Sequence, residues 1–590
     1  MLEGAFDTYP VDNLDAAWLN ISLADHGISA EPVPKGQGLP SWLLNDASPD
    51  FADQVYAQKW SIARAAADSM LSEAQSWLAG QVNVSAAPSG ALASVTVFNS
   101  LSWSRSDVVL DLAKPAGAGQ LSVVTAGGGL VQSQLSADGS RVIFAADKVP
   151  SFGYTTYFVL PAAQVTTESG TAAPSLAGTP WTSQWSNNFF KLTPGVGGLH
   201  SVVDLASGAS LFDTTHYDVG EWMELQYTGM GASETHEYAG PWLNASTFAR
   251  LGNLSGQPIS WTCVEDGPAR VVFQTAPMRT AHSTVTLIVE AYSAVKRLDL
   301  RVKIAGWDSA FGVVNRVVLP INTQMRNVSY AAPFGVVRVG LDEAEAGFRD
   351  MWLLNPAANV DSFDRGFAMR PREIGDWIRV ECSDAVGVTI SSSVGAFDWT
   401  DPTGAYPPSQ PVLAPEMLLH TNSNRSPFLP EPGDHDFLFS ITASPPGWQS
   451  GWRAGVQGNN PLRSVTRAWP AAAAGASVTA AESLPLSAAF LTVSSAAGRG
   501  EDVEAWVTAV KKEDGEGRRG LIARLFAVSD ADLDGGVRIE SPWPLVGGAQ
   551  HTNLIELDSR DVPGVAANDT AFAAPLGRWS IETFRLGVLG

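Results

Sequence analysis

The spacing of apolar residues near the N-terminus predicts two amphipathic helices. Apolar side chains between Leu14 and Leu23 recur at intervals of three and four residues, which places them along one helical face. A longer Ala-rich stretch from about 50 to 78 has the same period, and Asp50 is the expected cap at its start. Because two such helices cannot bury their apolar faces alone, we interpret residues 1–90 as the remnant of a helical bundle.

From about residue 91 the pattern changes to the period of β-strands. No repeat of 20–50 residues stands out, which argues against propellers and solenoids. The chain is therefore expected to be mainly β. The clearest strand patterns are short segments rich in β-branched residues and bounded by turn residues, at 93–99, 107–110, 141–144, 283–289 and 297–302.

Two stretches rich in small residues and proline divide the β region. They run from about 161 to 180 and from about 470 to 481, and both have the composition of linkers. The predicted fold is a short helical-bundle stub followed by β-sandwiches. The expected sandwiches are a small one at 91–162, a large one at 180–468 and a C-terminal one at 484–590.

Composition and charge narrow the classes of function. The chain has 590 residues, enough to bury sizeable cores, and its formal net charge is −23. Such an acidic chain repels phosphate backbones and anionic lipids, so we expect neither a nucleic-acid nor a membrane partner. The start of the chain lacks a signal-peptide pattern, so we expect a cytoplasmic location. Cys263 and Cys382 are too few for a disulfide framework and leave room for one bridge.

The signature motifs of several enzyme classes do not occur in the sequence. We find no dinucleotide-binding or phosphate-binding glycine loop, no HExxH or CxxC metal motif and no nucleophile elbow. A pair of carboxylates for glycoside hydrolysis cannot be chosen among 60 acidic residues, because spacing does not show which of them converge. The sequence therefore leaves the catalytic residues unknown.

Histidines are the candidate metal ligands. His216 and Asp218 stand two residues apart, so on a strand both side chains would face the same way and could hold one cation. His26 follows the first predicted helix, where it serves either the negative end of the helix dipole or a metal. Four others have no visible partner in the sequence: His200, His282, His420 and His551.

Tryptophans are candidate platforms for stacking on sugar rings. Core positions are the better interpretation for most of them, because large aromatic side chains dominate the cores of sandwiches. The residues concerned are Trp181, Trp185, Trp222, Trp242, Trp399 and Trp448.

Several strings, in order along nearly the whole chain, resemble segments of glycoside hydrolase family 38 α-mannosidases. Val97–Arg105 is similar to the strand that opens the first β domain after the family's catalytic part. Asn187–Leu192, with Gly198–Asp204, is similar to the opening of the family's large sandwich, which implies a galactose-mutarotase-like sandwich here. Further similar strings are Val149–Tyr154, Pro333–Gly335, Asp434–Phe437, Asn460–Leu462 and Arg578–Phe584.

The resemblance also gives the helical stub a meaning. Ala17–Asn20 followed by Ala24–Gly27 looks like the helix and His loop that close the family's active site. His26 falls on the family's His ligand for a divalent metal, usually zinc. The family pattern continues as HD…G or HTWG, whereas here Gly27 is followed by Ile-Ser-Ala, so the loop departs from it.

The family's remaining catalytic groups belong to an N-terminal α/β barrel. The resemblance implies retaining hydrolysis through a covalent mannosyl-aspartate, with the metal holding two sugar hydroxyls. Only 17 residues precede Trp18, so we expect the barrel's nucleophile, acid/base and other metal ligands to be missing here. Zinc or another divalent metal would then bind only if a separate barrel completed the site.

Three functions follow as alternatives. The chain is the C-terminal half of an α-mannosidase-like glycoside hydrolase that is not competent alone, with carbohydrate and a separate barrel chain or a second copy as partners. In the second alternative, the chain is an independent glycosidase or esterase-type hydrolase with a site in the sandwiches. In the third, it is a structural and oligomerisation module. The first alternative predicts an exposed apolar patch near Trp18 and Trp60, and the second a pocket with convergent acids.

Overall fold

The protein is described from a computed structural model. The two longest described stretches are 49–115 and 520–587. The structure describes residues 9–24, 49–115, 119–162, 175–227, 248–253, 259–308, 310, 313–323, 327–339, 341–342, 372–398, 405–406, 410–419, 422–423, 426–427, 432–468, 483–496, 504–515 and 520–587.

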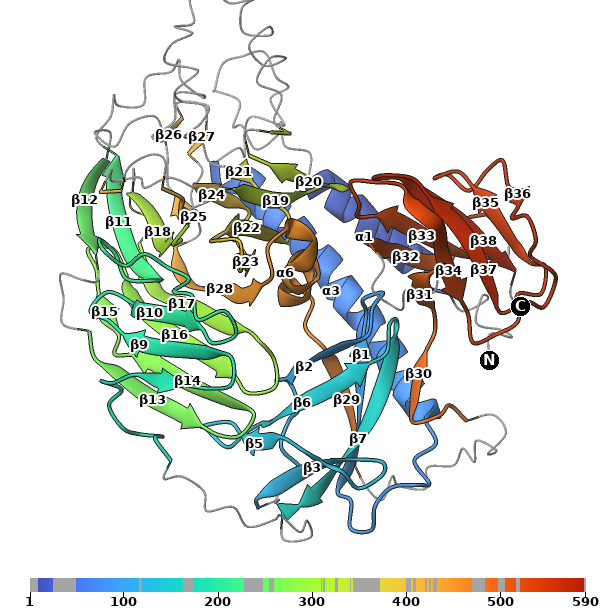
Figure 1. The fold of residues 1–590 in the computed structure, drawn as a ribbon, viewed down its shortest axis with the longest axis horizontal. Coiled ribbons are helices and arrows are strands. Elements are labelled where there is room, and N and C mark those ends of the chain that lie inside the picture. The colour runs from blue at the N-terminus through green and yellow to red at the C-terminus, as the bar shows by residue number, and fades with distance from the viewer. Residues whose placement is uncertain are drawn as a thin grey trace, which may run out of the picture. The chain divides into compact units, whose positions relative to one another are not determined.

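The chain divides into two compact units, each built from separate stretches of sequence. The first unit comprises Met1–Trp18, Ala63–Ala173 and Asn460–Gly590, and the second comprises Leu19–Ile62 and Pro174–Asn459. Strands dominate both, as Figure 1 shows, so the expected mainly β fold is confirmed.

The two predicted helices are present. Helix α1 (Val11–Ala24) and helix α3 (Pro49–Gln81) contain the predicted segments and extend a few residues beyond them. Ala63 and Ala79 are buried on α3, and this part of the helix lies against strand β29. There Arg463 Nη1 lies 3.3 Å from Asp68 Oδ1, and Arg467 Nη1 donates to the carbonyl of Ala79 over 3.0 Å.

The small sandwich of the first unit joins segments far apart in sequence. One sheet has the order β29-β1-β7-β3-β4, with β30 also on β7, and the other has the order β2-β6-β5. Residues 463–468, which we expected at the end of the large sandwich, form β29 and pair with β1. The strands are β1 (Ala93–Asn99), β2 (Arg105–Val109), β3 (Leu121–Thr125), β4 (Leu130–Val131), β5 (Ser133–Leu135), β6 (Val142–Val149), β7 (Gly153–Pro161), β29 (Arg463–Ala468) and β30 (Ser487–Ala489).

The hydrogen bonds of Asn99 give a physical reason for the motif at the end of β1. Its side-chain amide, which is nearly fully buried, donates to the carbonyls of Trp103, Val149 and Pro150 over 2.8, 3.2 and 2.9 Å. Its carbonyl oxygen accepts from the Leu101 amide over 3.0 Å and from Arg105 Nε over 2.9 Å. One side chain thus satisfies the backbone of two loops, as buried polar groups require.

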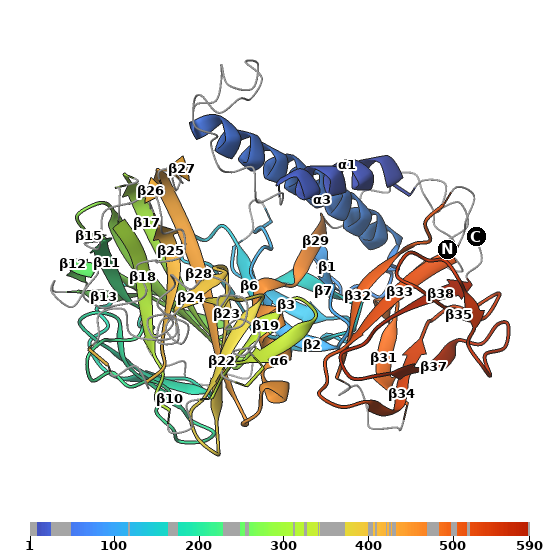
Figure 2. The ribbon, with the colours of Figure 1, turned by 90° about the horizontal axis from the view of Figure 1, so that it is seen from above.

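The C-terminal sandwich of the first unit has two facing sheets. Their orders are β31-β34-β37 and β32-β33-β38-β35-β36, with an apolar core between them (Figure 2). The Ser151 hydroxyl donates to the carbonyl of Leu491 over 2.8 Å and so ties this sandwich to the small one. The strands are β31 (Thr492–Ser495), β32 (Ala505–Lys512), β33 (Gly520–Ala527), β34 (Leu533–Glu540), β35 (Ala549–Thr552), β36 (Arg560–Asp561), β37 (Ala571–Leu576) and β38 (Ile581–Gly587).

The second unit contains the large sandwich. A long sheet with the order β13-β14-β16-β17-β28-β23-β22-β19-β20 faces a sheet with the order β12-β11-β18-β25-β24-β21, and β10-β9-β8 form a further sheet. Side chains of all three contribute to one continuous apolar core. Arg379 is fully buried in this unit, where Nε and Nη2 bond the Glu381 carboxylate over 2.6 and 3.1 Å.

The elements of this unit are listed in chain order. They are β8 (Trp185–Ser186), β9 (Phe190–Pro194), β10 (Leu199–Asp204), β11 (Glu221–Tyr227), β12 (Phe248–Asn253), β13 (Trp261–Asp266), β14 (Arg270–Thr275), β15 (Met278–Arg279), β16 (Thr284–Tyr292), β17 (Leu298–Trp307), β18 (Val313–Pro320), β19 (Val328–Ala332), β20 (Gly335–Arg338), β21 (Arg372–Glu373), β22 (Trp377–Glu381), β23 (Gly387–Ser392), β24 (Ala396–Asp398), β25 (Val412–Leu419), β26 (Asn422–Ser423), β27 (Ser426–Pro427), β28 (Gly433–Ser444), the 3₁₀-helix η5 (Trp448–Ser450) and α6 (Trp452–Asn459).

Candidate functional site

Two buried carboxylates lie against a glycine-rich turn between β9 and β10. The Gly197 amide donates to Asp218 Oδ2 over 2.7 Å, and the Asp218 amide donates to Glu221 Oε2 over 3.0 Å. A Cβ at Gly195 would collide with the Asp218 carboxylate, and one at Gly197 would collide with that of Glu221. The close approach of backbone to carboxylate therefore requires glycine at both positions.

The Asp218 carboxylate also orients His200. Its Oδ1 lies 3.2 Å from His200 Nδ1, and the side chain of Asp218 is 8 % exposed while that of His200 is 61 % exposed. A carboxylate beside Nδ1 keeps the proton of the neutral imidazole on that nitrogen and leaves Nε2 as an acceptor. The pair thus has the arrangement of an oriented base that remains open to solvent.

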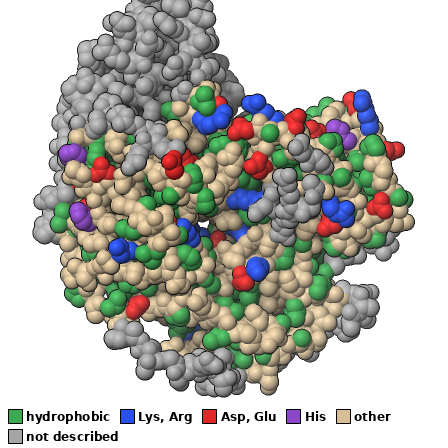
Figure 3. Space-filling view, viewed as in Figure 1, with side chains coloured by type: hydrophobic (Ala, Val, Ile, Leu, Met, Phe, Trp, Pro, Cys, Tyr) green, Lys and Arg blue, Asp and Glu red, His purple; other side chains and the backbone are tan. Residues whose placement is uncertain are grey.

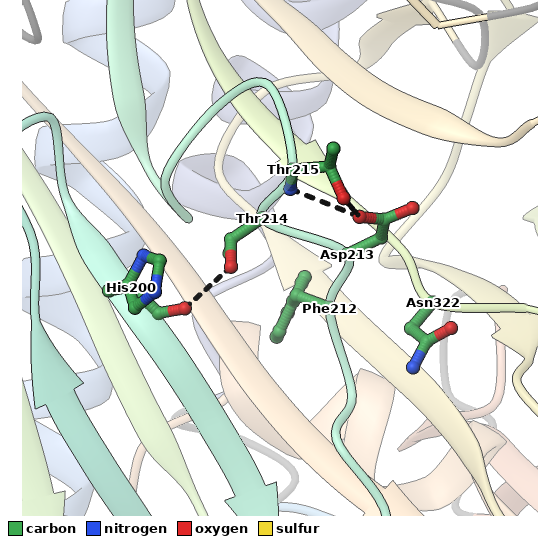
Figure 4. Close-up of a pocket in the computed structure, with 6 residues that line it drawn as sticks. All are labelled: His200, Phe212, Asp213, Thr214, Thr215 and Asn322. Atoms are coloured by element: carbon green, nitrogen blue, oxygen red, sulfur yellow. Dashed lines mark hydrogen bonds between the residues drawn. The ribbon is translucent and has the colours of Figure 1, made fainter.

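His200 lines an open pocket of about 410 Å³, shown in Figure 4. Strand β10 supplies His200, the loop before β11 supplies residues 212–215, and the segment just after β18 supplies Asn322. In Figure 4 the Phe212 ring lies between His200 on one side and Asn322 on the other. The lining residues are His200, Phe212, Asp213, Thr214, Thr215 and Asn322.

Hydrogen bonds among the lining residues fix the shape of the pocket. The Thr214 hydroxyl donates to the carbonyl of His200 over 2.7 Å. The amide and hydroxyl of Thr215 both donate to Asp213 Oδ1, over 3.0 and 2.6 Å. The Asp213 amide donates to the carbonyl of Pro320 over 2.8 Å, so the loop before β11 runs along the end of β18.

The structure places His216 and Asp218 in different surroundings. Residues 215–217 form a bend and not a strand, and His216 is exposed while Asp218 is buried. The His216 ring packs edge-on against Tyr406, with centroids 4.7 Å apart. Asp218 instead bonds Gly197 and His200. The metal site at His216 and Asp218 therefore stays a prediction whose premise, a shared strand face, differs from the observed bend.

The metal-site prediction at His26 falls on a residue outside the described part of the chain. Among the residues that the structure does describe, no group of three or more His, Cys, Asp or Glu side chains could hold a metal ion. Zinc prefers three or four protein ligands, so the described residues do not fit a metal centre by themselves. We therefore derive no chemical step through a metal.

Three histidines without a visible partner in the sequence have a carboxylate partner in the fold. Besides His200 with Asp218, His282 Nδ1 lies 3.0 Å from Asp308 Oδ2, and His551 Nε2 lies 2.6 Å from Glu582 Oε2. His420 lies outside the described residues. The sequence did not reveal these pairs because their partners are far apart along the chain. It did not reveal the pocket either, because the pocket residues come from three separate segments.

Most of the tryptophans considered as sugar platforms belong to the core. Trp181, Trp222 and Trp448 are buried, and Trp185 packs against the core of the large sandwich. Trp242 and Trp399 lie outside the described residues. The interpretation of the first group as core residues is confirmed.

Helices α1 and α3 expose large apolar side chains. Trp18 on α1 is 65 % exposed, and Trp60 and Trp77 on α3 are 48 % and 54 % exposed. Leu19, Ile62 and Leu71 are exposed as well. No helix that the structure describes is long and apolar enough to cross a bilayer. On the molecular face drawn in Figure 3, basic side chains lie interspersed with acidic ones.

Comparison with solved structures shows which proteins share the fold of this chain. No protein-family model and no curated protein matches the sequence. The crystal structure of an α-mannosidase from Enterococcus faecalis V583 aligns with 99 % of this chain and 64 % of its own chain, at 15 % identity and a TM-score of 0.62. A protein in glycosyl hydrolase family 38 from Enterococcus faecalis aligns with 98 % of this chain and 66 % of its own, at 14 % identity and a TM-score of 0.63.

A third structure covers a smaller part of the chain. A putative aldose 1-epimerase from Escherichia coli aligns with 44 % of this chain and 98 % of its own, at 10 % identity and a TM-score of 0.27. The chain spans about two thirds of the length of the two Enterococcus faecalis structures. Over nearly its whole length, it has the fold of glycoside hydrolase family 38 structures, as the sequence resemblance predicts.

Proposed function

We propose that this chain forms the β-sandwich part of an α-mannosidase-type glycoside hydrolase and is not a competent mannosidase by itself. Its role in this proposal is to hold a catalytic α/β barrel through helices α1 and α3. The observation that carries the proposal is the exposure of Trp18, Trp60 and Trp77 on these helices.

Exposed tryptophans on a helix are costly unless a partner covers them. A tryptophan buries roughly 150–250 Å² when it enters a core or an interface, and each Å² of apolar area contributes roughly 25 cal/mol. Covering the exposed halves of three such side chains is therefore worth several kcal/mol, about the scale of a specific protein contact. A partner with an apolar face is the simplest chemical complement, and in this proposal the barrel supplies that face.

The fold likeness supports the same proposal. The two mannosidase-type structures are longer than this chain, which aligns with 64 % and 66 % of them. In the family that the chain resembles, the mechanism needs a metal centre. The proposal assigns the remaining ligands and the carboxylates of hydrolysis to the barrel.

The test is an assay of the purified chain on a panel of aryl glycosides that includes an α-mannoside, with and without a chelator, together with a metal analysis. We expect no turnover and no stoichiometric metal. A dye that fluoresces on apolar surfaces should bind the chain and should bind a Trp60→Ser/Trp77→Ser variant several-fold less. Turnover of an α-mannoside that persists through repurification would refute the proposal.

A second candidate function is an independent hydrolase with its site in the large sandwich. The observation that favours it is the His200–Asp218 pair beside a pocket that also contains Asp213. An oriented imidazole with a free Nε2 can remove a proton from water or from a substrate hydroxyl. If the panel reveals turnover of any substrate, His200→Gln should reduce kcat at least 10²-fold, while His282→Gln, which alters a similar pair elsewhere, should not.

A further inference from the structure

The pocket lies where β10 begins and β18 ends. Its rim is rigid because the loop is bonded to the strands on both sides. The Asn322 amide donates to the carbonyl of Leu211 over 3.0 Å, and the Asn322 side chain donates to the carbonyl of Ser210 over 3.0 Å. The Tyr406 hydroxyl donates to the carbonyl of Asp213 over 2.5 Å. A site held in this way needs little ordering when a ligand binds.

Most of the polar atoms left over for a ligand are acceptors. Asp213 uses Oδ1 for Thr215, so its Oδ2 has no partner among the described residues. Asn322 uses one of its two side-chain N–H groups for Ser210, which leaves its oxygen as an acceptor and one N–H as a donor. His200 faces Asp218 with Nδ1, which leaves Nε2 as an acceptor in the neutral ring. The ligand must therefore be rich in hydrogen-bond donors.

Charge and size narrow the class of ligand further. Among the described residues no group of three or more His, Cys, Asp or Glu side chains could hold a metal ion, so a cation is disfavoured. An anion would meet the Asp213 carboxylate in a chain of net charge −23, so anions are disfavoured. The volume of about 410 Å³ lies at the lower end of the roughly 300–1,000 Å³ of small-molecule pockets. Phe212, 3 % exposed and part of the core, gives the pocket an apolar base.

We propose that this pocket binds one neutral hexose residue of a glycan through its hydroxyl groups. Sugar hydroxyls would donate to Asp213 Oδ2, to the side-chain oxygen of Asn322 and to His200 Nε2. The hydroxyls of Thr214 and Thr215 already donate within the protein and can each accept one further bond. The inference concerns binding alone and needs no chemical step at His200.

This inference goes beyond the proposed function and does not depend on the barrel. It concerns the large sandwich, whereas the proposed function depends on the exposed tryptophans of α1 and α3. Sugar binding and mannoside turnover are measured separately, so the failure of either proposal leaves the other standing.

The test is saturation-transfer NMR on the full chain with D-mannose, D-glucose and D-galactose, followed by titration of the best of them. We expect binding with a dissociation constant in the millimolar range for at least one hexose. Asp213→Asn keeps the oxygen that Thr215 bonds and replaces Oδ2 by a donor, so it should weaken binding at least roughly 10-fold. Asn322→Ala is the second variant and should weaken binding as well.

The matched control is His282→Gln, which alters a half-buried His–carboxylate pair outside the pocket and should leave binding unchanged. His200→Gln should weaken binding, because it moves an acceptor at the pocket. A thermal unfolding scan checks that each variant is folded. Absence of saturation transfer from all three hexoses would overturn the inference, and so would equal affinity of wild type and Asp213→Asn.

Discussion

Replacing Asn99 by alanine should strongly destabilise the small sandwich. The side chain donates to three carbonyls and accepts from two donors, but its amide group has only two protons, so it makes about four full hydrogen bonds. At roughly 1 kcal/mol net for each, the loss is about 4 kcal/mol, because the buried partners find no water. Asn99→Asp is nearly isosteric and should cost at least as much, since a carboxylate would face three carbonyl oxygens.

The measurement is hydrogen exchange of the peptide that covers 93–109, read by mass spectrometry. A loss of about 4 kcal/mol corresponds to an opening equilibrium on the order of 10³-fold more populated, so protection of this peptide should fall accordingly. Asn83→Ala is the control, because Asn83 Oδ1 accepts a single bond from the exposed Ser85 amide, and it should change stability by less than about 0.5 kcal/mol. A loss below about 1 kcal/mol in Asn99→Ala would refute the hydrogen-bond reasoning.

Three further predictions concern buried charges and thiols. Arg379→Met should cost about 3–5 kcal/mol in urea unfolding, because it leaves the Glu381 carboxylate buried and unpaired, whereas Arg538→Met breaks a half-exposed pair and should cost under about 1 kcal/mol. Burial raises the pKa of the Cys263 thiol to about 11 and that of the Cys382 thiol to about 12. Neither thiol should therefore react with a thiol reagent at pH 8 until the chain unfolds, and reaction of the native chain would contradict this. Burial also raises the pKa of Asp376, so its ionised form opposes folding above that pKa. Asp376→Asn should therefore raise the urea midpoint at pH 7.5. If this rise in the midpoint did not shrink as the pH is lowered, the reasoning would be contradicted.

The periodicity of the sequence predicted several strands, because those strands bury one or both faces in a core. The segment 93–99 forms β1, and its residues are buried throughout. The resembling strings also have physical reasons in the structure. Gly153, in the string that ends with Tyr154, has no room for a Cβ because the carbonyl of Ala488 on β30 lies against it.

The pocket could not be predicted from the sequence in the same way. His200 and Asp218 are eighteen residues apart in sequence, and Asn322 comes about a hundred residues later. They meet because the loop before β11 runs along the end of β18, a long-range pairing that leaves no periodic pattern. The Asp218 carboxylate that bonds His200 also accepts from the Gly197 amide, and the sequence does not show this close approach of backbone to carboxylate.

The pairing of β29 with β1 has a consequence for synthesis on the ribosome. Phe98 faces Arg463, which emerges 365 residues later. At roughly 5–20 residues per second, the edge of β1 that β29 will cover waits for about 20–70 s before its partner exists. An unpaired edge of this kind is a template for wrong pairing with other chains, so in the nascent protein this edge is the place where a chaperone or early helix contact would matter most.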